Sequence, residues 1–301
     1  MGWELLTAAF TLVALLHPVR CCPSREFIYP CSCMQSVMGT HVMCSAVDSM
    51  DALSVPFQYL RDYSVTRMLL TNLNLSSPGD LFGGLQMDTL KVVDSTFQLT
   101  VACSVTNLEL MRSVADMESV VRINRLHSLY VQNSTMRRFE RLVALTELTQ
   151  LTVDSSHVVP AINTGTSVFI DIPSLVQLTW TNNALEAIQR NFFARDCSQL
   201  KSIDLSDNKL SSLPDDIFTN MPVLETVLLS RNAFHVLHKQ PWIPILQQLK
   251  SVRLDGNPLV CNSTSQWLME DLAGRVTGTC AARAGPVRRE LSSMHRYRRC
   301  S

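Results

Sequence analysis

Four evenly spaced copies of one leucine-rich pattern constrain the fold of this chain more than any other feature. The copies begin at Leu175, Leu200, Leu224 and Leu249, and each fits L-x-x-L-x-L-x-x-N-x-L with apolar residues at the L positions. Self-similarity at a period of about 25 residues predicts a solenoid, in which each unit packs against its neighbours. Repeat arrays of this kind usually present an extended binding surface, and few of them are enzymes.

Five weaker copies of the pattern precede these four. Their first residues are Val65, Met87, Val105, Leu126 and Leu148. They keep the apolar positions, but the ninth position, where the later copies carry asparagine, is occupied by Ser113, Ser134 and Ser156 in the copies that begin at Val105, Leu126 and Leu148. We therefore expect about nine repeats within residues 61–259.

Each repeat is expected to supply one short strand near its positions 3 to 7, and the strands are expected to pair in parallel into one curved sheet. Side chains at positions 1, 4, 6 and 11 then point into the core, whereas those at positions 3, 5 and 7 point to the concave face. The predicted fold class is an α/β leucine-rich repeat solenoid with short helices and loops on its convex side and disulfide-bonded caps at its ends.

The later repeats contain two further structural signals. Their ninth-position side chains can both donate and accept hydrogen bonds, so a column of them is expected to satisfy buried loop backbone groups; the column is Asn183, Asn208, Asn232 and Asn257. Leu213, Ile217 and Phe218 are spaced for a short turn of helix on the convex side. Phe193 and Phe218 fill equivalent slots one repeat apart and are expected in the core.

Cysteines gather at both ends of the array, where an open solenoid would expose its terminal layer of leucines. The front group is Cys22, Cys31, Cys33 and Cys44, and the back group is Cys261, Cys280 and Cys300. We expect a cysteine-rich N-terminal cap over residues 22–60, and a C-terminal cap with a basic tail over residues 260–301.

This organisation resembles the extracellular leucine-rich repeat proteins with cysteine-rich caps. The resemblance implies that Cys22 pairs with Cys33, Cys31 with Cys44, and Cys261 with Cys280. The C-terminal cap of that family usually begins C-x-C, but here Asn262 and Ser263 follow Cys261, which leaves Cys300 without its family partner. The short front cap also loosely resembles small secreted arthropod proteins, a group that includes the non-catalytic subunit of a shrimp luciferin monooxygenase.

The sequence also predicts secretion. Residues 1–21 resemble a signal peptide, because the apolar stretch from Leu5 to Leu16 is too short to span a bilayer with any margin. No later segment is apolar enough for a membrane anchor, and the formal net charge of zero gives no case for nucleic acid. Three triplets are candidate N-glycan acceptors, at Asn74, Asn133 and Asn262.

Three cysteines remain outside the expected pairs once the signal peptide is removed. Cys103 and Cys197 lie four strand steps apart, about 19 Å at a strand spacing of about 4.8 Å, so they are too distant for a disulfide. Each is expected to be a buried thiol. An odd cysteine count makes Cys300 a candidate for an intermolecular disulfide, and a free or differently paired thiol is equally compatible.

The sequence contains no hydrolase motif, no phosphate-binding glycine loop and no zinc-spaced cluster, so we predict no catalytic residue, metal or cofactor. A mixed set of charged and aromatic residues at outward positions favours a protein partner. The residues predicted to bind it are Arg67, Lys91, Glu109 and Tyr130. The function predicted is a secreted, non-enzymatic scaffold or subunit of a secreted complex; the alternative is a soluble receptor-like binder or antagonist of an extracellular signalling or immune ligand.

Overall fold

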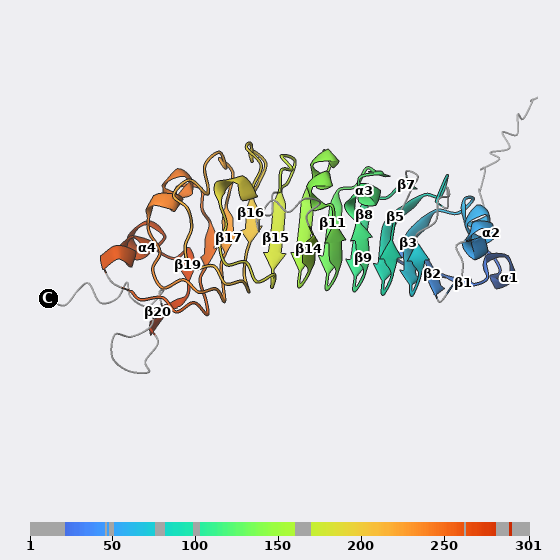
Figure 1. Cartoon of the computed structure of the whole chain (residues 1–301), viewed down its shortest axis with the longest axis horizontal. Coiled ribbons are helices and arrows are strands. Elements are labelled where there is room, and N and C mark those ends of the chain that lie inside the picture. The colour runs from blue at the N-terminus through green and yellow to red at the C-terminus, as the bar shows by residue number, and fades with distance from the viewer. Residues whose placement is uncertain are drawn as a thin grey trace, which may run out of the picture.

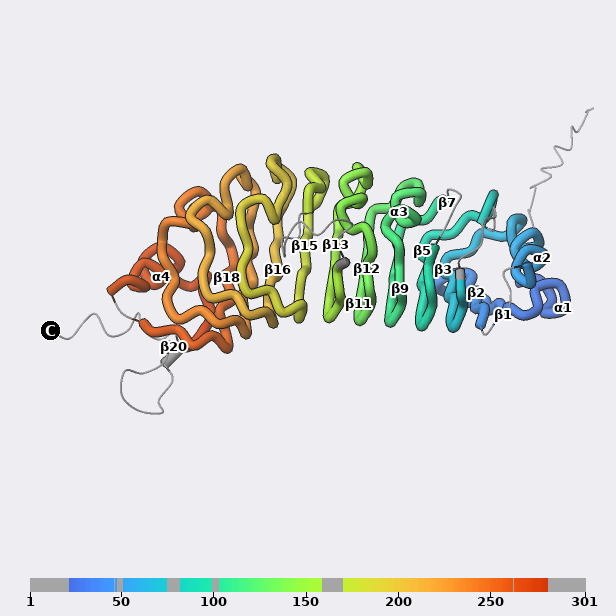
Figure 2. Tube along the Cα trace, in the orientation of Figure 1, coloured from blue at the N-terminus to red at the C-terminus, as the bar shows by residue number. Residues whose placement is uncertain are grey.

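One twelve-stranded sheet runs the length of the chain in the computed structural model, which describes residues 22–45, 47, 51–75, 82–98, 103–159, 170–261, 263–280 and 289–290. The strands stand side by side in an elongated, curved array, with the N-terminal cap at one end and the C-terminal cap at the other (Figures 1 and 2). The sheet lines the concave side, and loops with short helical turns cover the convex side.

Each of the nine repeats contributes one strand to this sheet. In spatial order they are β3 (Val65–Thr71), β5 (Met87–Val93), β8 (Asn107–Met111), β11 (Ser128–Gln132), β13 (Gln150–Asp154), β15 (Gln177–Thr181), β16 (Ser202–Asp204), β17 (Thr226–Leu228) and β18 (Ser251–Arg253). All eight pairings between them are parallel and keep equivalent repeat positions opposite each other. The expected curved parallel sheet is therefore confirmed.

The caps extend the same sheet at both ends. The hairpin of β1 (Cys31–Ser36) and β2 (Gly39–Ser45) joins at the front, where β2 pairs in parallel with β3. At the back, β19 (Val276–Thr277) pairs in parallel with β18. The concave face therefore extends beyond the nine predicted repeats into both caps.

Side chains alternate along each repeat strand between the core and the concave face. In β8, Leu108 and Leu110 are buried while Asn107, Glu109 and Met111 are only partly buried. The first position of every repeat is also buried, and successive repeats stack these residues into one continuous core. The predicted orientation of positions 1, 4 and 6 toward the core is confirmed.

A second parallel sheet, absent from the sequence prediction, lies beside the first five repeats. Its strands are β4 (Asn74–Leu75), β6 (Thr96–Phe97), β9 (Val114–Asp116), β12 (Thr135–Arg137) and β14 (His157–Val159). They belong to the five repeats that lack the ninth-position asparagine. Between the two sheets, the eighth residue of each of the nine repeats has a positive φ, from Asn72 (55°) to Gly256 (79°). The chain therefore turns in the same way in every repeat.

The predicted asparagine column is present in the later repeats. Asn208 donates to the carbonyl of Trp180 in the previous repeat at 2.8 Å and accepts from the backbone N–H groups of Asn183 and Leu185 at 3.1 Å. In the early repeats the serines replace it: Ser134 Oγ accepts from the N–H of Ser113 at 3.0 Å. Both side-chain types satisfy backbone groups that stacking removes from water.

The convex side contains short helical turns. They are α3 (Met117–Val120), η1 (Phe139–Ala144), η2 (Arg190–Phe192) and η3 (Gln240–Ile245). The helix expected near Ile217 is wrong, because residues 215–220 form turns with isolated bonds, Ile217 N–H to Pro214 O and Thr219 N–H to Asp216 O. Phe193 and Phe218 are buried as expected.

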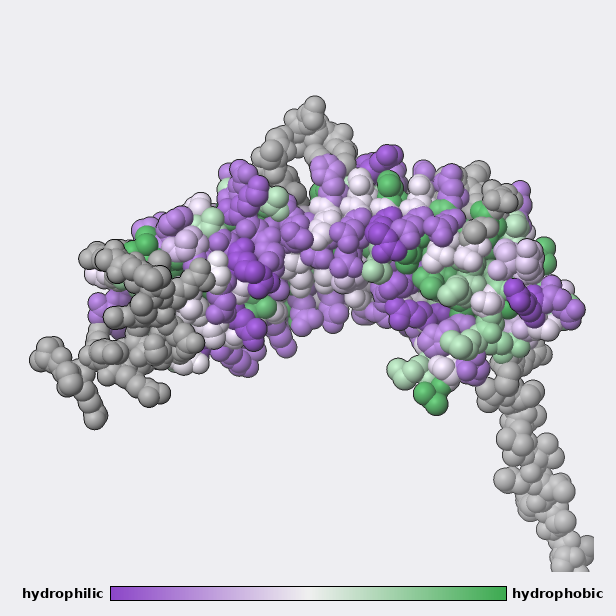
Figure 3. Space-filling view, turned by 90° about the horizontal axis from the view of Figure 1, so that it is seen from below, coloured by the Kyte–Doolittle hydropathy of each residue, from purple (hydrophilic) through white to green (hydrophobic). Residues whose placement is uncertain are grey.

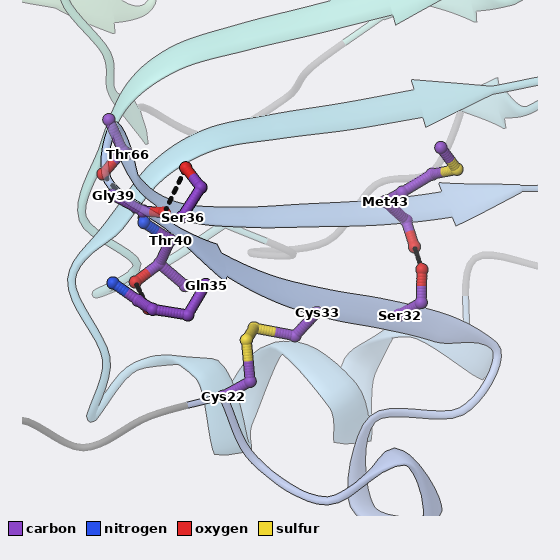
Figure 4. Close-up of a disulfide and its surroundings, with 9 residues drawn as sticks. All are labelled: Cys22, Ser32, Cys33, Gln35, Ser36, Gly39, Thr40, Met43 and Thr66. Carbon is purple, nitrogen blue, oxygen red and sulfur yellow. Dashed lines mark hydrogen bonds between the residues drawn. A yellow bond between two sulfur atoms is a disulfide. The ribbon is translucent and has the colours of Figure 1, made fainter.

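Each cap contains disulfides within it, in the pairing that the family resemblance implies: Cys22–Cys33 and Cys31–Cys44 at the front and Cys261–Cys280 at the back. Helices α1 (Arg25–Ile28) and α2 (Asp51–Leu60) complete the front cap. The hairpin turn requires Gly39, whose φ is 108° and where a Cβ atom would overlap the hydroxyl of Thr66 (Figure 4). That hydroxyl accepts from the N–H of Thr40 at 3.2 Å, which fixes β2 against β3.

The back cap contains η4 (Ser263–Ser265), α4 (Gln266–Asp271) and the hairpin of β20 (Thr279–Cys280) and β21 (Arg289–Glu290). Trp267 of α4 is buried and donates to the carbonyl of Leu237 at 3.1 Å, which ties the cap to the eighth repeat. A small parallel strand pair joins the ends of the second and third repeats, and consists of β7 (Cys103–Ser104) and β10 (Ile123–Asn124). Both Cys103 and Cys197 are buried free thiols, as expected.

Several predictions concern residues outside the described ranges. The signal peptide at residues 1–21, the glycan acceptor Asn262 and Cys300 all fall there. Asn74 and Asn133 are described and are exposed. Among the helices within the described ranges, none is long and apolar enough to cross a membrane.

Candidate functional site

Strand register brings the predicted binding residues together on the concave face. Lys91 lies opposite Glu109, and Glu109 lies opposite Tyr130, on the adjacent strands β5, β8 and β11. Arg67 is on β3, next to β5. These four residues form what we call the charged cluster. Its members come from four successive repeats, so their spacing is set by the stacking of the solenoid and not by loop conformation.

Ion pairs hold the charged cluster in one arrangement. One terminal nitrogen of the Arg67 guanidinium donates to both carboxylate oxygens of Glu109, at 2.7 and 2.8 Å. The Lys91 ammonium lies 3.1 Å from the same carboxylate. Arg67 reaches across β5 to make this contact, because β5 separates β3 from β8. Two cations therefore converge on one carboxylate, and the three side chains remain partly exposed to solvent.

Tyr130, the fourth member of the charged cluster, lies opposite Glu109 as a half-buried phenol. Burial raises the pKa of Tyr130, and the negative charges of Asp154 and Glu109 raise it further. Asp154 belongs to the next strand and is held by Gln132 at 3.1 Å and Thr181 at 2.9 Å. The phenol consequently stays protonated at neutral pH and can donate or accept a hydrogen bond from a partner.

The sequence prediction missed an apolar end to this surface. The cap hairpin places Met43 opposite Leu69 of β3, so the row that contains Lys91, Glu109 and Tyr130 continues into the cap. Met34 and Met43 are both exposed. The signal was present in the alternation of Val42 and Cys44, which are buried, with Met43, but residues 22–60 were treated only as a cover for the core.

The concave face of the later repeats lacks a comparable group of ion-paired side chains in the described residues. Their fifth-position residues are Thr152, Thr179, Asp204, Leu228 and Arg253, and their third positions begin with Gln150 and Gln177. No salt bridge joins concave residues of one repeat to those of the next in the described part of repeats five to nine. The charged cluster is thus confined to the first four repeats.

The convex side has a groove of about 580 Å³ lined by Asp171, Arg190, Asn191, Phe193, Arg195, Asp216, Thr219 and Asn220. Arg190 is already satisfied there, since its guanidinium donates to the carbonyls of Ala194 at 2.9 Å and Thr219 at 2.8 Å, and also to those of Phe193 and Arg195. Its role is to tie together loop backbone. In the described ranges, no three His, Cys, Asp or Glu side chains gather in a way that could hold a metal ion.

Comparison with known proteins agrees with the fold. Residues 173–234 and 198–259 match the leucine-rich repeat family model, which covers the regular repeats. The chain also resembles the crystal structure of human 5T4 (Wnt-activated inhibitory factor 1, trophoblast glycoprotein), with 21% identity and a TM-score of 0.56 over 88% of this chain and 94% of that one. The fold is a leucine-rich repeat solenoid with disulfide-bonded caps.

Two other solved structures are similar to this solenoid. A chain of the TLR13–ssRNA13 complex matches 80% of this chain with 15% identity and a TM-score of 0.61, and this chain spans 37% of that one. A chain from an octameric complex of latrophilin 3, Unc5D and FLRT2 matches 74% of this chain and 85% of its own length, with 16% identity and a TM-score of 0.44. None of the curated proteins compared with the sequence matches it. The loose resemblance to small secreted arthropod proteins stays a prediction.

Proposed function

We propose that the chain is an extracellular, non-enzymatic recognition protein that binds a protein partner on the concave face of its first four repeats. The contact residues of this proposal are Arg67, Lys91, Glu109 and Tyr130. The observation that carries it is the charged cluster itself, which places fixed, partly exposed charges beside a half-buried phenol on an open sheet face. Groups that are already ordered lose little conformational entropy when a partner binds.

The composition of the surface favours protein over a polyanion. Nucleic-acid binding depends on unbalanced Lys and Arg that neutralise phosphates. Here two cations face Glu109, and Asp154 lies on the strand beyond Tyr130. Tyrosine and arginine are enriched in protein interfaces, and Met43 and Leu69 add an apolar end to the same row.

Extracellular location is part of the proposal. Three disulfides are typical of chains that fold in an oxidising compartment. We attribute secretion to the signal-like residues 1–21 and glycosylation to Asn74, Asn133 and Asn262. Exposure of Asn74 and Asn133 supports two of these sites.

Two roles fit such a protein, and co-purification distinguishes them. A carrier or stabilising subunit of a secreted complex would purify with a stoichiometric enzyme partner. A soluble receptor-like binder or antagonist would instead capture a signalling or immune ligand reversibly. Affinity capture from native extracellular fluid, analysed by mass spectrometry, identifies the partner in either case.

The captured partner then tests the surface. Tyr130→Ala and Glu109→Ala should each weaken binding in a direct titration without reducing the yield of folded protein. Thr179→Ala is the matched control, since Thr179 occupies the same repeat position two strands beyond Tyr130. Unchanged affinity in both cluster variants would remove this surface from consideration.

A further inference from the structure

The N-terminal cap exposes more large apolar side chains than the remainder of the described chain. Ten large hydrophobic residues in the described ranges are exposed, and all except Val143 and Ile243 lie between Phe27 and Tyr59. Figure 3 shows hydrophobic residues gathered at the cap end of the molecule, whereas the middle of the array is mostly hydrophilic. A cluster of this kind marks a surface that another molecule covers.

The cap also ends the main sheet with an open edge. β1 pairs with β2 on one side, and no described strand pairs with its other side. Edge strands are commonly protected by charged residues, by proline or by being very short. β1 is six residues long, and residues 31–45 contain no Asp, Glu, Lys, Arg or Pro. This edge therefore lacks the charged and proline residues that commonly block pairing with another strand.

Exposed apolar residues flank β1 at both ends. Tyr29, before the strand, is 71% exposed, while Val37 and Met38, at the hairpin tip after it, are 103% and 75% exposed. When two copies of one strand pair in antiparallel fashion, the end of each lies beside the beginning of the other. The hairpin tip of each copy would then cover the Tyr29–Pro30 segment of the other. The edge is thus complementary to itself.

We propose that two copies of this chain associate through antiparallel pairing of their β1 edges about a twofold axis, with the two Met34 side chains opposite each other. Met34 points to the concave face, since it lies opposite His41 on β2 and His41 lies opposite Arg67 on β3. Cys33 points to the other face, where it bonds Cys22 (Figure 4). The two concave faces then join into one continuous sheet surface.

An uncharged edge suits pairing with a second copy. Antiparallel pairing about Met34 sets residues of the same strand opposite each other, and like charges in that position destabilise a strand pair. A stable interface buries about 800 Å² on each partner, which is more than one strand edge supplies. We therefore assign the hairpin tip, Tyr29 and the neighbouring Phe27 to the interface. This association does not depend on what the concave face binds.

Sedimentation equilibrium of the full chain tests the association. A Cys300→Ser background removes that thiol as a route to dimers. In it, Met34→Arg should raise the dimer dissociation constant about tenfold or more, because it places like charges across the axis. Ile243→Arg alters an exposed apolar residue in the eighth repeat and should leave the constant unchanged. A chain that stays monomeric at high concentration overturns the proposal, even if its β1 edge binds an extended segment of another protein.

Cross-linking tests the geometry. Opposed residues of antiparallel strands have Cα atoms about 4.5 to 5.5 Å apart, which lies within the range of a disulfide. Met34→Cys in the Cys300→Ser background should therefore form a covalent dimer on oxidation, whereas Ile243→Cys should not. A dimer that persists in solution while Met34→Cys fails to cross-link would disprove the edge pairing.

Discussion

The backbone N–H of Ser156 donates to Oδ1 of Asn183 at 2.7 Å, and at this bond the serine column of the early repeats meets the asparagine column of the later ones. Asn183 also donates to the carbonyl of Val153 at 2.8 Å. Its side-chain amide therefore both accepts a hydrogen bond from the preceding repeat and donates one to it. Each serine instead bonds its own chain two residues back, as Ser134 does to Gln132 at 2.7 Å. One line of hydrogen bonds therefore joins both halves of the solenoid.

Ser134→Ala should destabilise the early repeats. The variant leaves the N–H of Ser113 without its acceptor in a buried position, which typically costs about 1–3 kcal/mol. Equilibrium unfolding in urea measures the loss. Ser211→Ala, which changes an exposed serine of the seventh repeat, is the control and should leave the unfolding midpoint unchanged. Equal effects of the two variants would contradict the structural role of the serine column.

Asn208→Ala should be more damaging than Ser134→Ala. The Asn208 amide donates to three backbone carbonyls and accepts from two backbone N–H groups, whereas the Ser134 hydroxyl accepts from one. We expect hydrogen exchange to accelerate at the amides of Asn183 and Leu185, which lose their acceptor. Protection of these two amides at the level of the unsubstituted chain would show that Asn208 is not their essential partner.

The regular half of the fold could be predicted from sequence because one pattern fixes strand, core and turn together. The second sheet could not, because its strands are only two or three residues long and show no periodic pattern of their own; they are β4, β6, β9, β12 and β14. The left-handed turn at position 8 was also hidden, since Arg112, Asp94 and Gly256 share no residue type. Gly, Asn and Asp tolerate that conformation. Where the residue is Arg or Ser, its backbone N–H bonds the next repeat, as that of Arg112 bonds the carbonyl of Gln132.

The residues of the charged cluster could be predicted from the sequence, but the contacts between them could not. Repeat position alone places Lys91, Glu109 and Tyr130 in one row. Nothing in the sequence indicates that Arg67 crosses an intervening strand to reach Glu109, because that contact depends on side-chain length and sheet curvature. Met34 and Met43 were missed because the cap was read as a cover and not as two more strands of the same face.

Ionisation of Tyr130 should lower the free energy of unfolding at alkaline pH. Its folded-state pKa is raised, so its contribution is fully present below the unfolded pKa of about 10 and is lost as pH rises through the folded value. Tyr130→Phe should therefore weaken the alkaline fall in the urea midpoint. Tyr59→Phe alters an exposed ring and should leave the fall unchanged. A pH profile that is the same in all three proteins would exclude Tyr130 as a source of the dependence.

Cys103 and Cys197 should resist alkylation in the folded protein. Burial raises the pKa of Cys103 to about 12 and also raises that of Cys197, whose Sγ donates to the carbonyl of Ala194 at 3.2 Å. At pH 8.5 a thiol with a pKa of 12 is ionised to roughly one part in three thousand, and the thiolate is the reactive form.

Iodoacetamide at pH 8.5, followed by peptide mass spectrometry, measures this resistance in a Cys300→Ser background. Neither thiol should be labelled in buffer, and both should be labelled in concentrated urea with the disulfides intact. The urea sample is the control for reagent and detection. Rapid labelling of Cys103 in buffer would mean that the second repeat opens on the timescale of the reaction, because the reagent cannot reach a thiol that stays buried in the core.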